Sequence, residues 1–144
     1  MAEHPVPSGD RAVVLQPVAE PDKAVLANLF QLYCHGLSKF RGFEVSEHRT
    51  FSYRLLDHYW TEPGRNAFII RSGDNIAGFA LVATTAEGER ERAEFFILRA
   101  HRREGVGRAA AQSLLAQFSG SWVVAHDKAN DTAGRFWTTV IGDA

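Results

Sequence analysis

The sequence predicts an α/β fold of the α+β kind, in which a mixed, mostly antiparallel central sheet is flanked by about four helices. The expected elements follow the order strand, helix, helix, three strands, helix, strand, helix. The last two strands enclose a helix and should therefore run parallel to each other. With 144 residues, 45% of them hydrophobic, the chain can form one compact core and not two. We therefore expect one domain over residues 12–144, preceded by a flexible tail over the proline-containing residues 1–11.

The first half of the chain predicts one strand and two helices. Residues 12–18 contain a short β-branched run, which is typical of a strand. Residues 23–40 repeat apolar side chains at three- and four-residue spacing, as a helix with one buried face requires. Residues 47–60 show a shorter helical pattern, which Pro63 and Gly64 bring to an end.

The second half alternates strands with helices. Two apolar runs flank the turn residues of positions 72–75 and predict a hairpin. The expected strands cover residues 67–71, 76–84, 95–98 and 122–125, and the expected helices cover residues 107–118 and 131–141. Gly120 is placed to close the first of these helices.

The charge balance excludes a general affinity for polyanions. Sixteen Lys and Arg residues stand against 17 Asp and Glu residues, which gives a formal net charge of -1. We therefore expect no nucleic acid and no membrane among the partners, and any basic site must be local.

The cysteine content and the N-terminus indicate a reducing compartment. Cys34 is the only cysteine and cannot form an internal disulfide. The N-terminus lacks the basic and apolar regions of a secretory signal, and no run approaches the roughly 18 apolar residues of a membrane span. We therefore expect a cytoplasmic protein. The histidines and Cys34 show none of the short paired spacings of a metal site, so we also expect no metal.

One segment, residues 99–108, carries a pattern typical of phosphate binding. Four arginines (Arg99, Arg102, Arg103 and Arg108) and two glycines lie between an expected strand and an expected helix. Glycines let a backbone approach a ligand closely, and the first N–H groups of a helix bind phosphate oxygens. Arginine adds charge-assisted contacts to the same oxygens. The segment therefore predicts a site for a diphosphate or polyphosphate group.

The sequence argues against three other kinds of binding site in this segment. A P-loop is excluded, because the chain has no Gly-x-x-x-x-Gly-Lys-Ser/Thr run. A dinucleotide fingerprint is a closer rival, since residues 105–110 fit Gly-x-Gly-x-x-Ala and Asp127 follows after the next strand. Against it, the loop before Gly105 is long and the unit lies in the last third of the chain. A nucleic-acid module would need a second basic stripe, which the sequence lacks.

The segment resembles a known family signature. Arg102-Arg103-Glu104-Gly105-Val106-Gly107 matches Arg/Gln-x-x-Gly-x-Gly/Ala of the GCN5-related N-acetyltransferase (GNAT) family, and it stands between the fourth expected strand and the third expected helix. The order of elements agrees with that family from residue 13 to residue 141. Asn130-x-x-Ala133-x-x-Phe136-Trp137 looks like the family's helix beside the coenzyme.

The resemblance implies an acetyl-CoA-dependent N-acetyltransferase that transfers an acetyl group to a primary amine by direct attack in a ternary complex. The acceptor stays unidentified. Acetyl-CoA enters as a substrate, and no metal is implied. The backbone of three residues would pair with the pantetheine arm: Phe96, Ile97 and Leu98. Seven residues would hold the pyrophosphate: Arg102, Arg103, Glu104, Gly105, Val106, Gly107 and Arg108. Four residues would line the other side of the coenzyme: Asn130, Ala133, Phe136 and Trp137.

The sequence indicates the residues for proton transfer less clearly than those for coenzyme binding. An ammonium acceptor must lose a proton before it attacks. Glu94 is the first choice of base, because many family members carry an acidic residue there and it shares a strand face with Phe96 and Leu98. A solvated carboxylate at a strand end is the open alternative, and His126 is the second choice of base.

The sequence departs from the family at two points. Many members have a tyrosine acid in the last helix, where this chain reads Phe136-Trp137; Tyr33, Tyr53 or Tyr59 could replace it. Members usually add two more strands beyond the last helix, so we expect those strands to be missing. Either a second subunit then covers the strand at residues 122–125, giving a homodimer, or the chain is a shortened version. A non-catalytic acyl-CoA sensor or inactive homologue is the alternative function.

Overall fold

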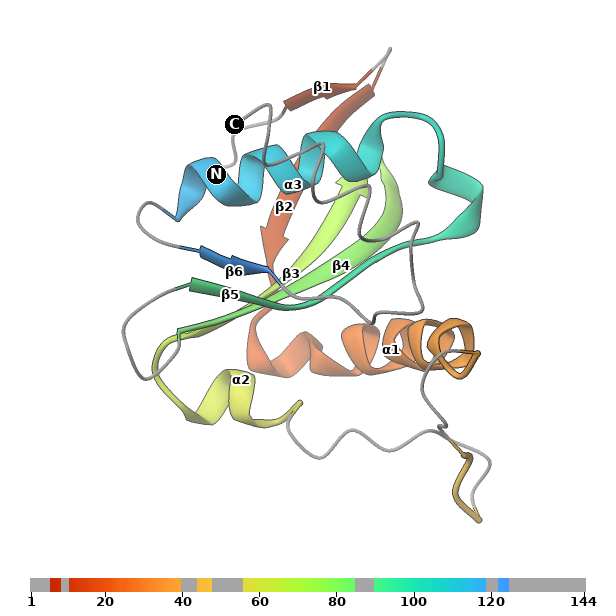
Figure 1. Ribbon diagram of the computed structural model, residues 1–144, viewed down its shortest axis with the longest axis vertical. Coiled ribbons are helices and arrows are strands. Elements are labelled where there is room, and N and C mark those ends of the chain that lie inside the picture. The colour runs from red at the N-terminus through yellow and green to blue at the C-terminus, as the bar shows by residue number, and fades with distance from the viewer. Residues whose placement is uncertain are drawn as a thin grey trace.

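The computed structural model describes residues 6–8, 11–39, 44–47, 56–84, 90–118 and 122–124 (Figure 1). Within this part, the strands form one six-stranded sheet of order β1-β2-β3-β4-β5-β6. The strands are β1 (Val6–Ser8), β2 (Arg11–Pro17), β3 (Arg65–Ser72), β4 (Asn75–Thr84), β5 (Arg90–Ile97) and β6 (Trp122–Val124). Neighbouring strands are antiparallel except β5 and β6, which are parallel. The predicted mixed, mostly antiparallel sheet is confirmed.

Helices cover both faces of this sheet. In the described part they are α1 (Lys23–Leu37), α2 (His58–Thr61) and α3 (Val106–Gln117), with 3₁₀ turns at Glu20–Asp22 and Arg99–His101. Figure 1 shows α3 on one side of the sheet and α1 and α2 on the other. Of the predicted second helix at residues 47–60, Glu47 is a turn residue, residues 48–55 lie outside the described part, and the described helix is α2. The predicted helix at residues 131–141 lies outside it as well.

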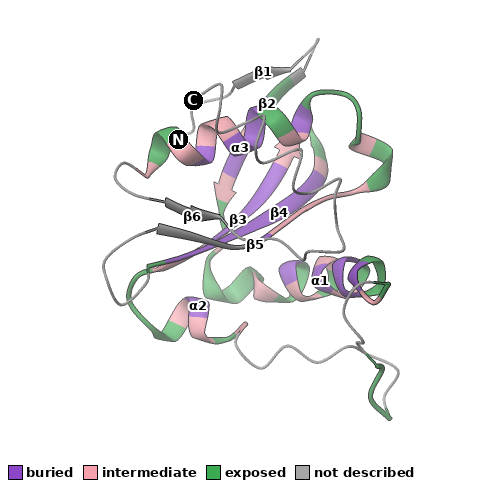
Figure 2. Ribbon diagram, in the orientation of Figure 1, coloured by how far each residue is buried: buried purple, intermediate pink, exposed green. Residues whose placement is uncertain are grey.

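The core on the α1 side follows the helical period of the sequence. Leu26, Phe30, Tyr33 and Leu37 recur every three to four residues and are buried, as the purple bands on α1 in Figure 2 show. They pack against the buried side chains of β3 and β4, among them Phe79, whose ring lies 5.5 Å from that of Phe30. This face of the helix holds α1 on the sheet.

The core on the α3 side depends on small residues. Ala109, Ala110 and Ala111 are buried along α3, so the helix can lie close to the sheet. Val106 and Leu114 complete the buried face. From β5, Phe95 and Ile97 pack against this cluster.

The N-terminal segment differs from the prediction. Val6–Ser8, which the sequence places in a flexible tail, forms β1 and pairs with the start of β2. An edge strand pairs on one side only, so Pro7, which has no N–H to donate, is tolerated there. Because of this extra strand, the arginine-rich segment follows the fifth strand instead of the fourth.

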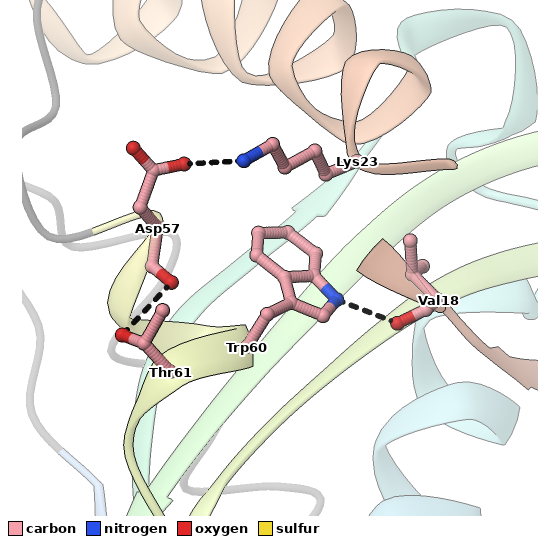
Figure 3. A network of polar contacts seen from close by, with 5 residues as sticks. All are labelled: Val18, Lys23, Asp57, Trp60 and Thr61. Atoms are coloured by element: carbon pink, nitrogen blue, oxygen red, sulfur yellow. Dashed lines mark hydrogen bonds and ion pairs between the residues drawn. The ribbon is translucent and has the colours of Figure 1, made fainter. Parts of the chain in front are cut away.

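Polar contacts join α2 to the start of α1 (Figure 3). The indole Nε1 of half-buried Trp60 donates a hydrogen bond to the carbonyl oxygen of Val18 at 2.8 Å. Lys23 Nζ lies 3.2 Å from Asp57 Oδ1, with both side chains largely exposed. A buried hydrogen bond contributes more to stability than an exposed ion pair does.

We therefore expect Trp60→Phe to lower the free energy of unfolding by about 1 kcal/mol or more, since it removes the indole donor. Asp57→Asn, which removes only the exposed ion pair, should change it by less than about 0.5 kcal/mol. Urea unfolding of both variants measures the difference. Equal losses would contradict this account of how α2 is held.

Candidate functional site

The centre of the candidate site is a buried carboxylate on β5. Glu94 is 8% exposed, and Tyr33 of α1, which is 7% exposed, donates a hydrogen bond from its hydroxyl to Glu94 Oε2. The open alternative of a solvated carboxylate at a strand end is therefore excluded by the burial of Glu94. The two residues are 61 positions apart in sequence.

A bulge in β5 sets the direction of Glu94. The register pairs Leu81 with Glu94 but Val82 with Arg92, so Ala93 is an extra residue on β5. Such a bulge bends a strand and re-aims the side chains beside it. Glu94 and Phe96 then lie on the α1 side of the sheet, as their shared strand face predicts.

Aromatic rings pack around the hydrogen-bonded pair of Tyr33 and Glu94. The Tyr33 ring lies 5.3 Å from the fully buried Phe79 ring and 5.6 Å from the Phe96 ring, and those two rings are 5.7 Å apart. Apolar surroundings strengthen a hydrogen bond, because water does not compete for its donor and acceptor. The pair therefore occupies a rigid, low-dielectric part of the sheet face.

The end of β5 presents a carbonyl group away from β4. The N–H of Leu98 donates to Ala77 O at 2.7 Å, so the carbonyl of Ile97, in the same peptide group, points in the opposite direction. In the described part, β6 pairs with β5 only along Arg90–Arg92. Ile97 thus lies beyond that ladder, on the edge that leads into the arginine-rich segment.

Arg102 turns back onto this edge. Its Nε donates to Ile97 O at 2.8 Å, and its guanidinium lies 5.9 Å from the centre of the Phe96 ring. Burial lowers the pKa of Arg102, and the positive charge of Arg99 adds to the shift. The contact with Ile97 uses one of the five N–H donors of the guanidinium.

Two left-handed residues then turn the chain into α3. Arg103 has a φ of 65° and Gly105, the N-cap residue of α3, a φ of 78°. No side chain caps α3, so the N–H groups of its first turn, including those of Val106 and Gly107, point out of the helix at its positive end. Arg102, Arg103 and Arg108 are exposed around this helix start. Cationic side chains and helix N–H groups therefore converge in a way that suits an anionic ligand.

A histidine and a glutamate support the same loop. His101 Nδ1 lies 3.6 Å from Glu104 Oε1, with the histidine side chain 12% exposed. This separation is too long for a hydrogen bond but allows an ion pair when the imidazole is protonated. Glu104 is therefore an exposed residue whose carboxylate can pair with the largely buried His101 at the base of the loop.

The structure brings together part of the predicted site. The residues from Glu94 to Arg108 form one continuous path along β5, the 3₁₀ turn and the start of α3. The other predicted residues lie outside the described part: His126, Asn130, Ala133, Phe136 and Trp137. Of the three tyrosines proposed as a replacement acid, Tyr33 contacts Glu94, Tyr59 packs beneath Arg65 and Tyr53 is not described.

The described residues include neither a metal-binding cluster nor a membrane-spanning helix. No group of three or more His, Cys, Asp and Glu side chains within them could hold a metal ion. None of their helices is long and apolar enough to cross a membrane.

The fold and the loop together define a class of protein. In this mixed α/β fold, the bulged strand β5 is followed by a glycine- and arginine-rich loop at the start of a helix. Strands β1 to β5 are antiparallel, which rules out the parallel sheet of a dinucleotide-binding fold. The model of the acetyltransferase (GNAT) family matches residues 27–142. The chain therefore belongs to the GNAT family of acetyltransferases, whose general activity is acyl transfer.

Solved structures agree with this assignment at the level of the fold. The presumed acetyltransferase YycN of Bacillus subtilis shares 12% identity, with a TM-score of 0.65 over 89% of this chain and 90% of that one. The aminoglycoside acetyltransferase meta-AAC0020 from an uncultured soil metagenomic sample, in complex with sisomicin, shares 16%, with a TM-score of 0.61 over 89% and 86%. The Vibrio cholerae integron cassette protein VCH_CASS6 shares 18%, with a TM-score of 0.60 over 89% and 83%. No curated protein matches the sequence.

Proposed function

We propose that this protein is a cytoplasmic N-acetyltransferase that moves an acetyl group from acetyl-CoA to a primary amine by direct attack in a ternary complex. The observation that carries the proposal is the continuity of β5 with the anion-binding loop. Buried Glu94 lies on β5, and the end of this strand at Ile97 is followed by Arg102 five residues later and by the start of α3 nine residues later. A proton acceptor and a phosphate site are thus held at a fixed separation, as transfer from a long phosphorylated coenzyme requires.

The coenzyme would bind along the exposed edge and the loop. The Ile97 carbonyl faces away from β4 and already accepts a hydrogen bond from Arg102, and its second lone pair can accept one from an amide of the pantetheine arm, alongside Phe96 and Leu98. The pyrophosphate would lie at the N–H groups of the first turn of α3, between Arg102 and Arg108. Gly105, in the left-handed region and without a side chain, leaves room for this approach.

Glu94 would act as the general base. It takes one proton from the ammonium group of the acceptor, directly or through water, and the neutral amine then attacks the thioester carbonyl. As the carbon–sulfur bond breaks, the second proton passes from the nitrogen to the departing sulfur, which leaves as the thiol, or to water, in which case the coenzyme leaves as the thiolate. A thiol with a pKa near 8.5 is a tolerable leaving group without a dedicated acid. His126 is the second choice of base.

Calorimetric titration with acetyl-CoA tests the binding half of the proposal, and Gly105 offers a matched pair of variants. Asn and Asp are of similar size and both tolerate a positive φ, but only Asp adds negative charge beside the pyrophosphate. We expect Gly105→Asp to weaken binding at least about tenfold more than Gly105→Asn does, which corresponds to about 1.4 kcal/mol. Arg103→Ala should also weaken binding and reduce its salt dependence.

The outcomes of this titration are distinct. Equal loss of acetyl-CoA affinity in the Asp and Asn variants would show that side-chain bulk, and not charge, limits binding at this loop. No binding of acetyl-CoA to the wild type would overturn the proposal, and nicotinamide dinucleotides and DNA would then be titrated in its place. Binding of acetyl-CoA without release of its thiol in the presence of any amine would favour the alternative function, an acyl-CoA sensor.

A homodimer stays a prediction. β6 is the last strand of the described sheet, and a second subunit that covered it would remove an edge prone to pairing. Sedimentation tests this, and a stable monomer with normal transfer activity would contradict it.

A further inference from the structure

Tyr33 is the least expected member of the candidate site. It lies on the buried face of α1, far from the arginine-rich segment in sequence, and it is 7% exposed. Its hydroxyl donates to Glu94 Oε2, so the proposed base has a phenol partner from a helix that no sequence motif marks.

Packing holds the Tyr33 hydroxyl in this place. The tyrosine ring contacts Phe30 at 5.5 Å with an interplanar angle of 67°, and Phe79 at 5.3 Å with an angle of 82°. Edge-to-face contacts of this kind restrict a ring to one orientation. The ring therefore cannot follow Glu94 if the carboxylate turns, and the hydrogen bond fixes the rotation of the carboxylate instead.

The hydrogen bond from Tyr33 opposes the effect of burial, which by itself would favour the neutral acid. A carboxylate that is 8% exposed has lost most of its hydration, and a hydrogen bond from a neutral hydroxyl partly replaces it. A bond of this kind is stronger to the carboxylate than to the carboxylic acid. Tyr33 thus stabilises Glu94 in the state that can accept a proton.

We propose that Tyr33 is a positioning residue, which orients the Glu94 carboxylate and keeps it ionised for proton transfer from the amine; this rests on the proposed function. The proton moves from the amine nitrogen to a Glu94 oxygen, and Tyr33 keeps its own proton throughout. Tyr33 touches neither substrate in this scheme and acts through Glu94 alone. Its contribution should therefore vanish when Glu94 can no longer accept a proton.

Four proteins test this dependence: the wild type, Tyr33→Phe, Glu94→Gln and the double variant. Thiol release from acetyl-CoA is measured with spermidine, an amino acid amide, kanamycin and a lysine-containing peptide, and kcat and KM are determined for the fastest of them. We expect Tyr33→Phe to lower kcat by about 10- to 100-fold, with the KM for acetyl-CoA changed less than about twofold. In the Glu94→Gln background, Tyr33→Phe should cause no further loss.

Trp60→Phe is the matched control. It removes the hydrogen-bond donor of another aromatic side chain that packs against the same core cluster, and we expect it to leave kcat at the wild-type value. Unchanged binding of acetyl-CoA to Tyr33→Phe, measured by calorimetry, would show that this variant is folded.

Three results would overturn the proposal. Wild-type kcat in Tyr33→Phe, with only a lower melting temperature, would make the hydroxyl purely structural. Losses that multiply in the double variant would show that Tyr33 acts independently of Glu94. Both results leave the proposed function intact, whereas a wild type that transfers to none of the amines removes the proposed function and the role of Tyr33 with it.

Discussion

Replacing Glu94 with glutamine is expected to lower the turnover of acetyl transfer by about 10²- to 10⁴-fold, the usual contribution of a general base. Glutamine has nearly the same shape as glutamate, and its amide oxygen can still accept the hydrogen bond from Tyr33. The fold and the affinity for acetyl-CoA should therefore persist, since Glu94 lies on the α1 side of β5, away from the phosphate loop. Thiol-release kinetics and calorimetry on the same preparation separate the two quantities.

A carboxylate outside the site provides the control for this variant. Glu62 is half-exposed and pairs with Arg65 at 3.1 Å, and Glu62→Gln should leave turnover unchanged. If Glu94→Gln kept more than about a third of the wild-type turnover, another group would have to take the proton. His126→Ala would then be the next variant to measure.

Replacing Gly78 with alanine is expected to destabilise the protein by about 3 kcal/mol, at the upper end of typical overpacking costs. Gly78 lies in β4 opposite Ile97, and an added Cβ would overlap the carbonyl oxygen of Phe96. It would also lie 2.9 Å from the carbonyl carbon of Phe96 and 3.0 Å from the Cα of Ile97. All three are backbone atoms, so no side-chain rotation can relieve the overlap and β5 itself must move.

The same variant should weaken the binding of acetyl-CoA, because a shift of β5 moves the Ile97 carbonyl and the loop that follows it. Urea unfolding and calorimetric titration measure the two effects. Gly36→Ala is the control: its added Cβ would meet nothing within 4 Å, and alanine is the better helix former. We expect this change to stabilise the protein by about 0.5–1 kcal/mol. Effects of the same sign at the two glycines would contradict the close approach of β4 and β5.

Features with a local cause could be predicted from the sequence. The apolar period of α1 and α3 places their buried faces, and both helices begin within about one residue of the predicted start. The arginine and glycine pattern predicts a loop at a helix start, because the left-handed turn at Gly105 needs a residue with little steric restriction. The hairpin of β3 and β4 follows from its turn residues in the same way.

Features without a local signal were predicted less well. β1 is three residues long and contains a proline, so it depends on β2 for its formation.

The sequence by itself determined the mixed α/β class, the faces of the main helices and the position of the arginine- and glycine-rich loop, since periodicity, turn chemistry and charge density depend on neighbouring residues. Only the tertiary structure decided that Glu94 is buried and that Tyr33 is its partner. That contact joins residues 61 positions apart. It depends on where α1 lies along the sheet and on the extra residue at Ala93 that re-aims β5, and both are set by long-range packing between strands and helix, which no local pattern encodes.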